Sequence, residues 1–363
     1  MQLLYLILFI VLFPADHIPS VKSHSDPPPP ALYVLGDSLV DSGNNNLLPT
    51  LAKANYFPYG VNFARGPTGR FTNGRTIVDF IAEFLGLPYT PPYLSLRGLP
   101  QTQHRGMNYA SGSCGILHET GKYIGHCLSL ADQVDLLQMT IQFELPKYYQ
   151  SAEKLSSDLS RSIFVVSIGS NDYIMNYLQP FYDTRARYSP QSFAQLLVSN
   201  LSLQLQRIYQ MGARKILVFE VGPIGCIPSI TRKFQHNGQC VEEINQMALI
   251  YNDHLITMLK SLRSKLPASQ FILGRVHGLA YDAIKNPSTY GLQDTSNPCC
   301  KTWANGTSAC ILNLLPCRDT QKHFFWDGFH LTEAVYKVVG ERCINDSSIC
   351  TPNSIKELVE HRH

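Results

Sequence analysis

The sequence ALYVLGDSLVDSGNNN, residues 31–46, decides how the rest of the chain is interpreted. It opens with an apolar run that ends at Gly36, and a short apolar run bounded by turn residues predicts a buried β-strand. Ser38 then follows the carboxyl end of that strand, the edge at which open α/β sheets bind their ligands. This position suits a nucleophile, although a serine after Gly-Asp is also ordinary turn chemistry. The stretch therefore defines a candidate that other segments must support.

The composition is that of a globular protein with few charges. The chain has 363 residues, of which 44% are hydrophobic and 16% charged, and its net charge is +3. Without a long basic block, a nucleic-acid surface is not expected. Because no linker or internal repeat follows Pro30, we predict a single domain over residues 31–363.

The N-terminus predicts secretion. Residues 3–13 are almost wholly apolar, which is too short for the roughly 20 residues of a membrane span and typical of a signal-peptide core. A small-residue cleavage site ends at Ser23, so residues 1–23 are predicted to be a signal peptide and residues 24–30 a stiff, proline-rich spacer. A buried N-terminal strand is the alternative, but Asp26 and four prolines separate the run from the domain. We expect no stable membrane insertion.

Ten cysteines follow the predicted leader, and in a secreted chain most should be paired. Two couples are close in sequence, Cys114 with Cys127 and Cys226 with Cys240. The connectivity of the others is left open: they are Cys299, Cys300, Cys310, Cys317, Cys343 and Cys350. No Cys-x2-Cys arrangement of the zinc-binding kind is present, and we predict no metal.

Three Asn-x-Ser/Thr sequons are candidate N-glycosylation sites, at Asn200, Asn305 and Asn345. Asn305 lies in a Gly/Ser/Thr loop and Asn345 follows a predicted helix end, so both are expected to be exposed. Asn200 falls close to the apolar face of a predicted helix and is the weakest candidate.

Strands and helices are predicted to alternate. Apolar runs predict strands at 31–35, 106–110, 163–168, 215–221 and 271–276. This alternation predicts a three-layer α/β/α sandwich around a central parallel sheet.

Helices are predicted where apolar residues recur every three to four positions. Two long ones cover 191–210 and 241–262, another is capped by Asn73, and a last one begins near Thr332. The cysteine-rich stretch at 297–318 is predicted to be a loop held by disulfides.

Three turns stand at the carboxyl ends of three predicted strands and hold Ser38, Gly112 and Asn171. In a parallel sheet these ends share one edge, so the turns can converge. Acyl transfer from an ester needs a nucleophile and donors directed at the oxyanion that its attack creates. The backbone N–H groups of Ser38 and Gly112 and the side-chain amide of Asn171 could supply them.

A fourth stretch, FWDGFH at 325–330, contains a candidate base. A serine hydroxyl is a poor nucleophile until a base takes its proton, and His330 is suited to that task. Asp327 is close enough in sequence to reach the imidazole N–H and fix its tautomer. By itself this spacing more often reflects a local hydrogen bond in a loop; the other three turns favour the catalytic interpretation.

Other polar residues are expected to have structural roles. Asp37 and Asp172 are predicted to hold their own turns. His118, His126 and His277 could ligate a metal in principle, but isolated histidines in loops are the more common case.

The chain resembles the plant-type GDSL esterase/lipase family of the SGNH hydrolase superfamily. The resemblance is carried by GDSL at 36–39 with the following DSGNN, NYASG at 108–112, GSND at 169–172, DGFH at 327–330 and GRFTNGRTIVDFIAEFLGLP at 69–88. It extends from about Ala31 to the final helix.

The resemblance implies a flavodoxin-like α/β/α sandwich and the hydrolysis of carboxylic esters without a cofactor. It implies Ser38 as nucleophile, Gly112 and Asn171 as oxyanion donors, and Asp327 with His330 as the acid–base pair. It also implies an extracellular protein of the cell wall or apoplast that carries N-glycans.

Two departures from the family pattern are visible. Cys114 follows Gly112 closely where relatives often carry small residues without cysteine, so a disulfide to Cys127 would pin this loop. Leu331 stands where relatives usually have proline, which loses a rigid helix start but touches no catalytic group.

The leading hypothesis is a secreted serine esterase that forms an acyl-enzyme on Ser38 and acts on lipid or other acyl or acetyl esters. A transacylase and a polysaccharide acetylesterase are variants on the same fold. A hypothesis from another class is a catalytically silent, secreted binding glycoprotein, which would have no need of Ser38, Asp327 and His330 together. The expected partner is a small-molecule or polymeric ester, not a nucleic acid.

Overall fold

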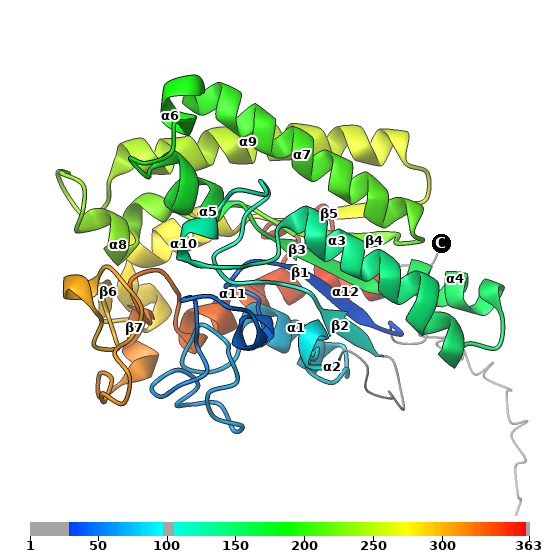
Figure 1. Cartoon of the computed structure of the whole chain (residues 1–363), viewed down its shortest axis with the longest axis horizontal. Coiled ribbons are helices and arrows are strands. Elements are labelled where there is room, and N and C mark those ends of the chain that lie inside the picture. The colour runs from blue at the N-terminus through cyan, green and yellow to red at the C-terminus, as the bar shows by residue number, and fades with distance from the viewer. Residues whose placement is uncertain (1–28, 97–104, 361–363) are drawn as a thin grey trace, which may run out of the picture.

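The computed structural model describes residues 29–96 and 105–360 (Figure 1). The predicted signal peptide, residues 1–23, lies outside the described residues, as does most of the spacer at 24–30.

A six-stranded sheet in the order β2-β1-β3-β4-β5-β8 runs through the centre of the molecule (Figure 1). Its strands are β1 (Leu32–Gly36), β2 (Gly106–Asn108), β3 (Ile163–Ser167), β4 (Lys215–Phe219), β5 (Gln270–Gly274) and β8 (Cys350–Thr351). Every residue of β1, β3 and β4 is buried, because helices cover both faces of the sheet. This explains why these strands are continuous apolar runs in the sequence.

The predicted three-layer α/β/α sandwich is confirmed, with one correction to the sheet. The strands β1 to β5 are parallel, as predicted. The edge strand β8 is antiparallel to β5, so the sheet is mixed. With two residues, β8 is too short to show the alternation from which strands are recognised.

The helices form two layers. In Figure 1, α3, α7 and α9 lie on one side of the sheet, and α1 and α11 lie on the other. The α-helices are α1 (Ile77–Phe84), α2 (Tyr93–Leu96), α3 (Leu130–Met139), α4 (Ala152–Arg161), α5 (Ser170–Asp172), α6 (Thr184–Arg187), α7 (Pro190–Gln210), α8 (Pro228–Thr231), α9 (Glu242–Lys265), α10 (Val276–Lys285), α11 (Glu333–Asn345) and α12 (Ile355–Glu360). Two π-helical segments, Thr140–Glu144 and Tyr173–Tyr177, continue α3 and α5.

Helix α1 begins later than predicted, and Asn73 is not its cap. Thr76 occupies the N-cap position, and its backbone N–H donates to Asp79 Oδ2 at 2.9 Å. Asn73 instead donates to Asn62 Oδ1 at 2.8 Å and accepts from the backbone N–H of Glu333 at 2.8 Å. It therefore joins the loop before α1 to the first residue of α11.

The cysteine-rich stretch forms a small unit beside the sheet. Strands β6 (Asp294–Pro298) and β7 (His323–Phe325) pair in parallel. Disulfides join Cys299 to Cys317 and Cys300 to Cys310. These bonds hold the chain that leads directly into the segment carrying Asp327 and His330.

Within residues 29–96 and 105–360, no helix combines the length and the apolar character needed to cross a bilayer.

The sheet order determines where a site can form. In the sheet, β2 and β3 lie on opposite sides of β1. The connection that follows β1 leads to β2, and the connection that follows β3 leads in the opposite direction, to β4. The two connections therefore diverge at the carboxyl ends of β1 and β3. Register pairs Gly36 with Ser167 at these ends. Such a switch point leaves a crevice in which open α/β sheets bind ligands, and Ser38 and Asn171 follow the two strands directly.

Candidate active site

Ser38, His330 and Asp327 form one continuous chain of hydrogen bonds. Ser38 Oγ lies 2.8 Å from His330 Nε2, and His330 Nδ1 lies 2.9 and 2.8 Å from the two carboxylate oxygens of Asp327. Because an ionised carboxylate only accepts hydrogen bonds, Nδ1 carries the proton and Nε2 is left to accept from the hydroxyl. The structure thus brings together three predicted site residues from opposite ends of the chain.

The segment holding Asp327 and His330 is fixed by its own backbone. Asp327 Oδ1 accepts from the N–H groups of Phe329 and His330, each at 2.8 Å. A Cβ on Gly328 would lie 2.7 Å from the backbone nitrogen of Ser308, so only glycine fits this turn. The turn from Asp327 to His330 therefore holds the carboxylate of Asp327 within hydrogen-bonding distance of the His330 imidazole.

Tyr59 is a partner of Asp327 that the sequence did not indicate. Its hydroxyl donates to Asp327 Oδ2 at 2.6 Å and accepts from the backbone N–H of Cys310 at 3.2 Å. Burial, the largest influence, raises the pKa of Asp327, but the charge of His330 and the hydrogen bonds from His330, Tyr59 and Phe329 outweigh it and lower the pKa below its usual value. Asp327 therefore stays ionised beside the imidazole.

The turn that carries Ser38 is organised by Asp41. Asp41 Oδ1 accepts from the N–H groups of Gly43 at 2.7 Å and Asn44 at 2.8 Å. The Asn44 side chain in turn donates to the Asn108 carbonyl at 2.9 Å, at the end of β2. The polar run after Ser38 is thus the framework that fixes the serine against the neighbouring strand.

Asp37, immediately before Ser38, is buried with one of its oxygens unpaired. Its Oδ1 accepts from the N–H of Leu39 at 3.0 Å, which is the predicted turn contact. Its Oδ2 has no hydrogen-bond partner among the described residues. Burial raises the pKa of Asp37 to about 7, because the charged form loses its hydration.

The three predicted oxyanion donors are placed differently. The Ser38 N–H makes no hydrogen bond to another described residue. Asn171 Nδ2 uses one hydrogen on the Cys114 carbonyl at 2.9 Å, which leaves its second hydrogen available. The Gly112 N–H points at Asp41 Oδ2, 3.3 Å away. Ser38 and Asn171 line the same cavity, whereas Gly112 in this structure is directed at Asp41.

Asp172 does not hold its own turn, so that prediction is wrong. It accepts from the N–H groups of Ile116 at 2.8 Å and Leu117 at 3.0 Å, and from the Thr120 hydroxyl at 2.7 Å. A Cβ on Gly115 would lie 2.4 Å from the Asp172 carboxylate. Because Asp172 is the neighbour of Asn171 in sequence, its carboxylate holds the loop after β2 close to Asn171.

The two cysteine couples are disulfides in the structure. Cys114 is bonded to Cys127 and Cys226 to Cys240. The first bond closes the loop whose carbonyl, at Cys114, orients the side chain of Asn171.

A cavity of about 1280 Å³ opens at Ser38. Ser38, Asn171 and His330 lie in its lining, and most of the remaining lining side chains are apolar. This volume exceeds the range of about 300–1,000 Å³ that is usual for small-molecule pockets. The site therefore has room for an extended ligand.

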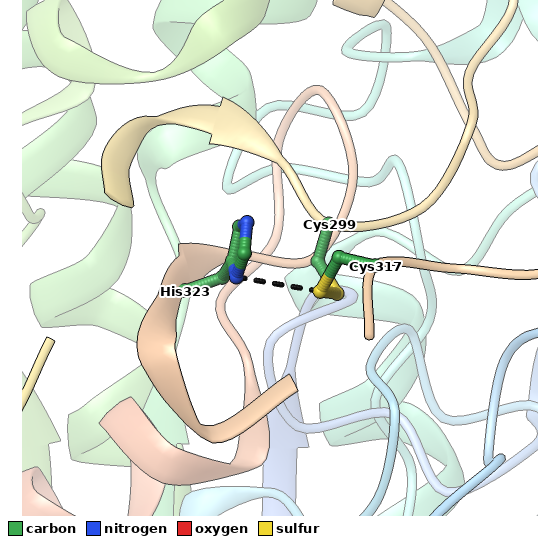
Figure 2. A group of neighbouring side chains, drawn as sticks. All are labelled: Cys299, Cys317 and His323. Atoms are coloured by element: carbon green, nitrogen blue, oxygen red, sulfur yellow. Dashed lines mark hydrogen bonds between the residues drawn. A yellow bond between two sulfur atoms is a disulfide. The ribbon is translucent and has the colours of Figure 1, made fainter. Parts of the chain in front are cut away.

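One group of side chains resembles a metal site but cannot act as one. Cys299, Cys317 and His323 offer sulfur and nitrogen atoms within 4.8 Å of one another. Figure 2 shows the two sulfurs joined in a disulfide, with His323 Nδ1 3.3 Å from Cys317 Sγ. A metal binds the thiolate form of cysteine, which the disulfide does not provide.

The three sequons differ in accessibility. Asn305 and Asn345 are exposed, and Asn200 is half-buried with its side-chain amide donating to the Leu196 carbonyl at 2.9 Å. Asn345 is the last residue of α11, whereas it was predicted to follow the end of a helix.

Comparison with known sequences identifies the family. The family model of the GDSL-like lipase/acylhydrolases matches residues 32–343. GDSL esterase/lipase 7 of Arabidopsis thaliana is 44% identical over 336 residues, which cover 91% of this chain and 92% of the relative. A second GDSL esterase/lipase from the same plant is 42% identical over 338 residues, covering 91% and 87%. The chain belongs to the GDSL-like lipase/acylhydrolase family.

The enzyme class follows from this membership: the protein is a carboxylic ester hydrolase with the SGNH fold. Among solved structures, a family two carbohydrate esterase from Clostridium thermocellum is similar with 12% identity and a TM-score of 0.38, over 87% of this chain and 62% of that one. Phospholipase A1 from Streptomyces albidoflavus is similar with 12% identity and a TM-score of 0.33, over 86% and 95%.

Proposed function

We propose that this hydrolase cleaves esters through an acyl-enzyme on Ser38, with His330 as the base and Asp327 as the residue that orients it. One observation carries the proposal: the unbroken chain of hydrogen bonds from Ser38 Oγ through the imidazole to Asp327. A structural role alone would not require a buried carboxylate, an imidazole and a hydroxyl in this order.

In the first step Ser38 Oγ attacks the ester carbonyl carbon while His330 Nε2 takes the hydroxyl proton. The Ser38 N–H and the free hydrogen of Asn171 Nδ2 donate to the oxyanion of the tetrahedral intermediate, and the Gly112 N–H joins them if it is released from Asp41. The C–O bond to the alcohol then breaks, and the alcohol leaves with the proton from His330. The product is an acyl ester of Ser38.

In the second step a water molecule attacks the acyl carbonyl and gives one proton to His330. The bond from the acyl carbon to Ser38 Oγ breaks, the acid is released, and the proton returns to the serine. An alcohol in place of water would make the protein a transacylase by the same chemistry. A cavity with mostly apolar lining favours an acyl-chain ester over an acetylated polysaccharide.

A serine-directed fluorophosphonate tests the proposal on the purified full-length protein. We expect the wild type to be labelled and Ser38→Ala to lose both the label and at least about 10³-fold in kcat/KM for p-nitrophenyl butyrate. Ser42→Ala is the matched control, because Ser42 is a buried serine in the same turn whose hydroxyl has no partner among the described residues. It should keep label and activity.

Two outcomes would count against the proposal. Labelling that persists in Ser38→Ala would assign the nucleophile to another residue. A wild type that is neither labelled nor active on any ester would leave a secreted binding glycoprotein as the better interpretation.

We also propose that the protein is secreted to the plant cell wall and carries N-glycans at Asn305 and Asn345, with Asn200 the least accessible sequon. All ten cysteines are bonded in five disulfides, which persist in oxidising compartments. Expression in plant cells should yield extracellular protein whose mass falls on glycosidase treatment. Retention in the cytosol without glycans would contradict this.

A further inference from the structure

Two segments of the chain contribute many of the side chains that line the cavity described above. One runs from the π-helical turn Tyr173–Tyr177 through α6, and the other from Ile224 through α8 to Phe234. Their lining side chains are mostly apolar; they include Ile174, Met175, Leu178, Ile227, Ile230 and Phe234. Such a surface suits a hydrocarbon chain, because removing CH₂ groups from water favours binding.

Each of these segments also contributes one cation to the lining, Arg185 from α6 and Lys233 from the chain after α8. Both side chains are exposed. Neither forms an ion pair or hydrogen bond with another described residue. By contrast, Lys53, which also lines the cavity, donates to three backbone carbonyls.

The acidic residues of the lining do not offset these two cations. Asp37 and Glu220 line the cavity with carboxyl groups that are buried, and burial raises the pKa of both. Glu220 is further engaged by the N–H of His277 at 3.2 Å and by Arg275 at 4.0 Å. The charge in the cavity lining that has no partner among the described residues is therefore positive.

We propose that the substrate of this site is an amphiphilic ester, with a hydrocarbon chain and an anionic group that Arg185 and Lys233 recognise. This inference rests on the proposed esterase function and specifies its substrate class. The apolar segments bind the chain, and the two cations bind a phosphate or carboxylate. A guanidinium offers a fork of donors and an ammonium a point charge, and both suit such anions.

The test compares three esters with the same octanoyl chain at concentrations below micelle formation: 1-octanoylglycerol 3-phosphate, O-octanoyl lactate and 1-octanoylglycerol. We expect the wild type to prefer the anionic esters in kcat/KM, and the preference to weaken with added salt because exposed charges are screened. The double variant Arg185→Gln/Lys233→Gln should lose about ten-fold in kcat/KM or more on the anionic esters. Its loss on 1-octanoylglycerol should be several-fold smaller, so that the ratio of kcat/KM for the anionic esters to kcat/KM for the neutral ester falls.

The first two esters distinguish the source of the charge. A loss confined to the phosphate ester assigns the cations to a phosphate, and a loss confined to octanoyl lactate assigns them to a carboxylate. Either result supports the proposal.

A matched control is the double variant Arg187→Gln/Lys260→Gln. Arg187 lies in the same short helix as Arg185 but pairs with Asp183 at 3.2 Å, and Lys260 is an exposed lysine of α9; neither lines the cavity. This variant removes the same net charge and should keep the preference for anionic esters.

The results separate the two levels of the argument. If the wild type hydrolyses the neutral and anionic esters equally, or if both double variants behave alike, the recognition of an anion is wrong while the esterase stands. If no ester is hydrolysed at all, the proposed function itself has failed.

Discussion

Tyr59 is the residue that completes the electrostatic environment of Asp327. Its hydroxyl is one of the groups that keep a fully buried carboxylate ionised, and a hydrogen bond to a charged group contributes about 1.5–3 kcal/mol. We expect Tyr59→Phe to lower kcat by about ten-fold and to leave KM nearly unchanged, because Tyr59 holds Asp327, which orients the base proposed above, His330. The measurement is the kinetics of p-nitrophenyl butyrate hydrolysis.

Tyr56→Phe is the control for that variant. The Tyr56 hydroxyl donates to the Cys310 carbonyl at 2.8 Å, and its ring packs edge-on against Tyr59 with the centroids 5.2 Å apart. Losing this hydroxyl should reduce the free energy of unfolding without changing kcat. Equal losses of kcat in the two variants would mean that both tyrosines serve only to hold the cysteine-rich unit.

Among single residues, the sequence predicted those candidate site residues that lie in short, recognisable motifs. Asp327 and His330 are near neighbours around a glycine, and Ser38 directly follows a strand, so short motifs identify them. Tyr59 is 268 positions from Asp327, in a loop whose composition does not distinguish it from the other tyrosines. Asp172 was misassigned for a related reason, since its partners belong to a loop more than 50 positions away.

Among the elements, the loop closed by Cys114 and Cys127 connects stability to catalysis. The disulfide spans 13 positions, and closing a loop of this length removes about 3 kcal/mol of entropy from the unfolded chain. Its Cys114 carbonyl also holds Asn171. We expect Cys114→Ala/Cys127→Ala to lower both the unfolding temperature and kcat, measured by thermal denaturation and ester hydrolysis.

The disulfide between Cys343 and Cys350 provides the comparison. It spans 7 positions and joins the end of α11 to β8, away from the serine. Its removal should cost about 2 kcal/mol of stability by the same argument and leave kcat unchanged in the folded protein. If the Cys114/Cys127 variant also kept full kcat, the loop would have no role in positioning Asn171.

The strands that were predicted are continuous apolar runs, whereas three helices of ten residues each were missed. Strands β3 and β4 were found because both of their faces are buried and the runs are continuous. Helices α3, α4 and α10 were not predicted. In α4 only Leu159 is fully buried, with Leu155 packed partly buried against the core, so its apolar face has only a few residues in a short helix. Such helices are stabilised by contacts with other elements around the sheet. These contacts cannot be recognised from the spacing of apolar residues in the sequence.

For the molecule as a whole, buried acids couple stability to pH. Burial raises the pKa of Asp37 to about 7 and that of Asp41 and Asp172 to about 6. An acid of this kind keeps its proton in the folded state over a pH range in which the unfolded chain has already released it. Raising the pH through that range favours the unfolded state. The free energy of unfolding should therefore fall between about pH 4 and pH 7.

Asp37→Asn isolates the contribution of one of these groups. The amide keeps the acceptor for the Leu39 N–H and cannot ionise, whereas the aspartate loses on the order of 1 kcal/mol of stability for each pH unit between about 4 and 7. In urea titrations, the two proteins should unfold at similar concentrations at pH 4, and the variant should become the more stable one as the pH approaches 8. A constant difference across this range would show that Asp37 has the same charge in the folded and unfolded chain. A variant that loses stability with rising pH as steeply as the wild type would instead assign the pH dependence to Asp41 and Asp172.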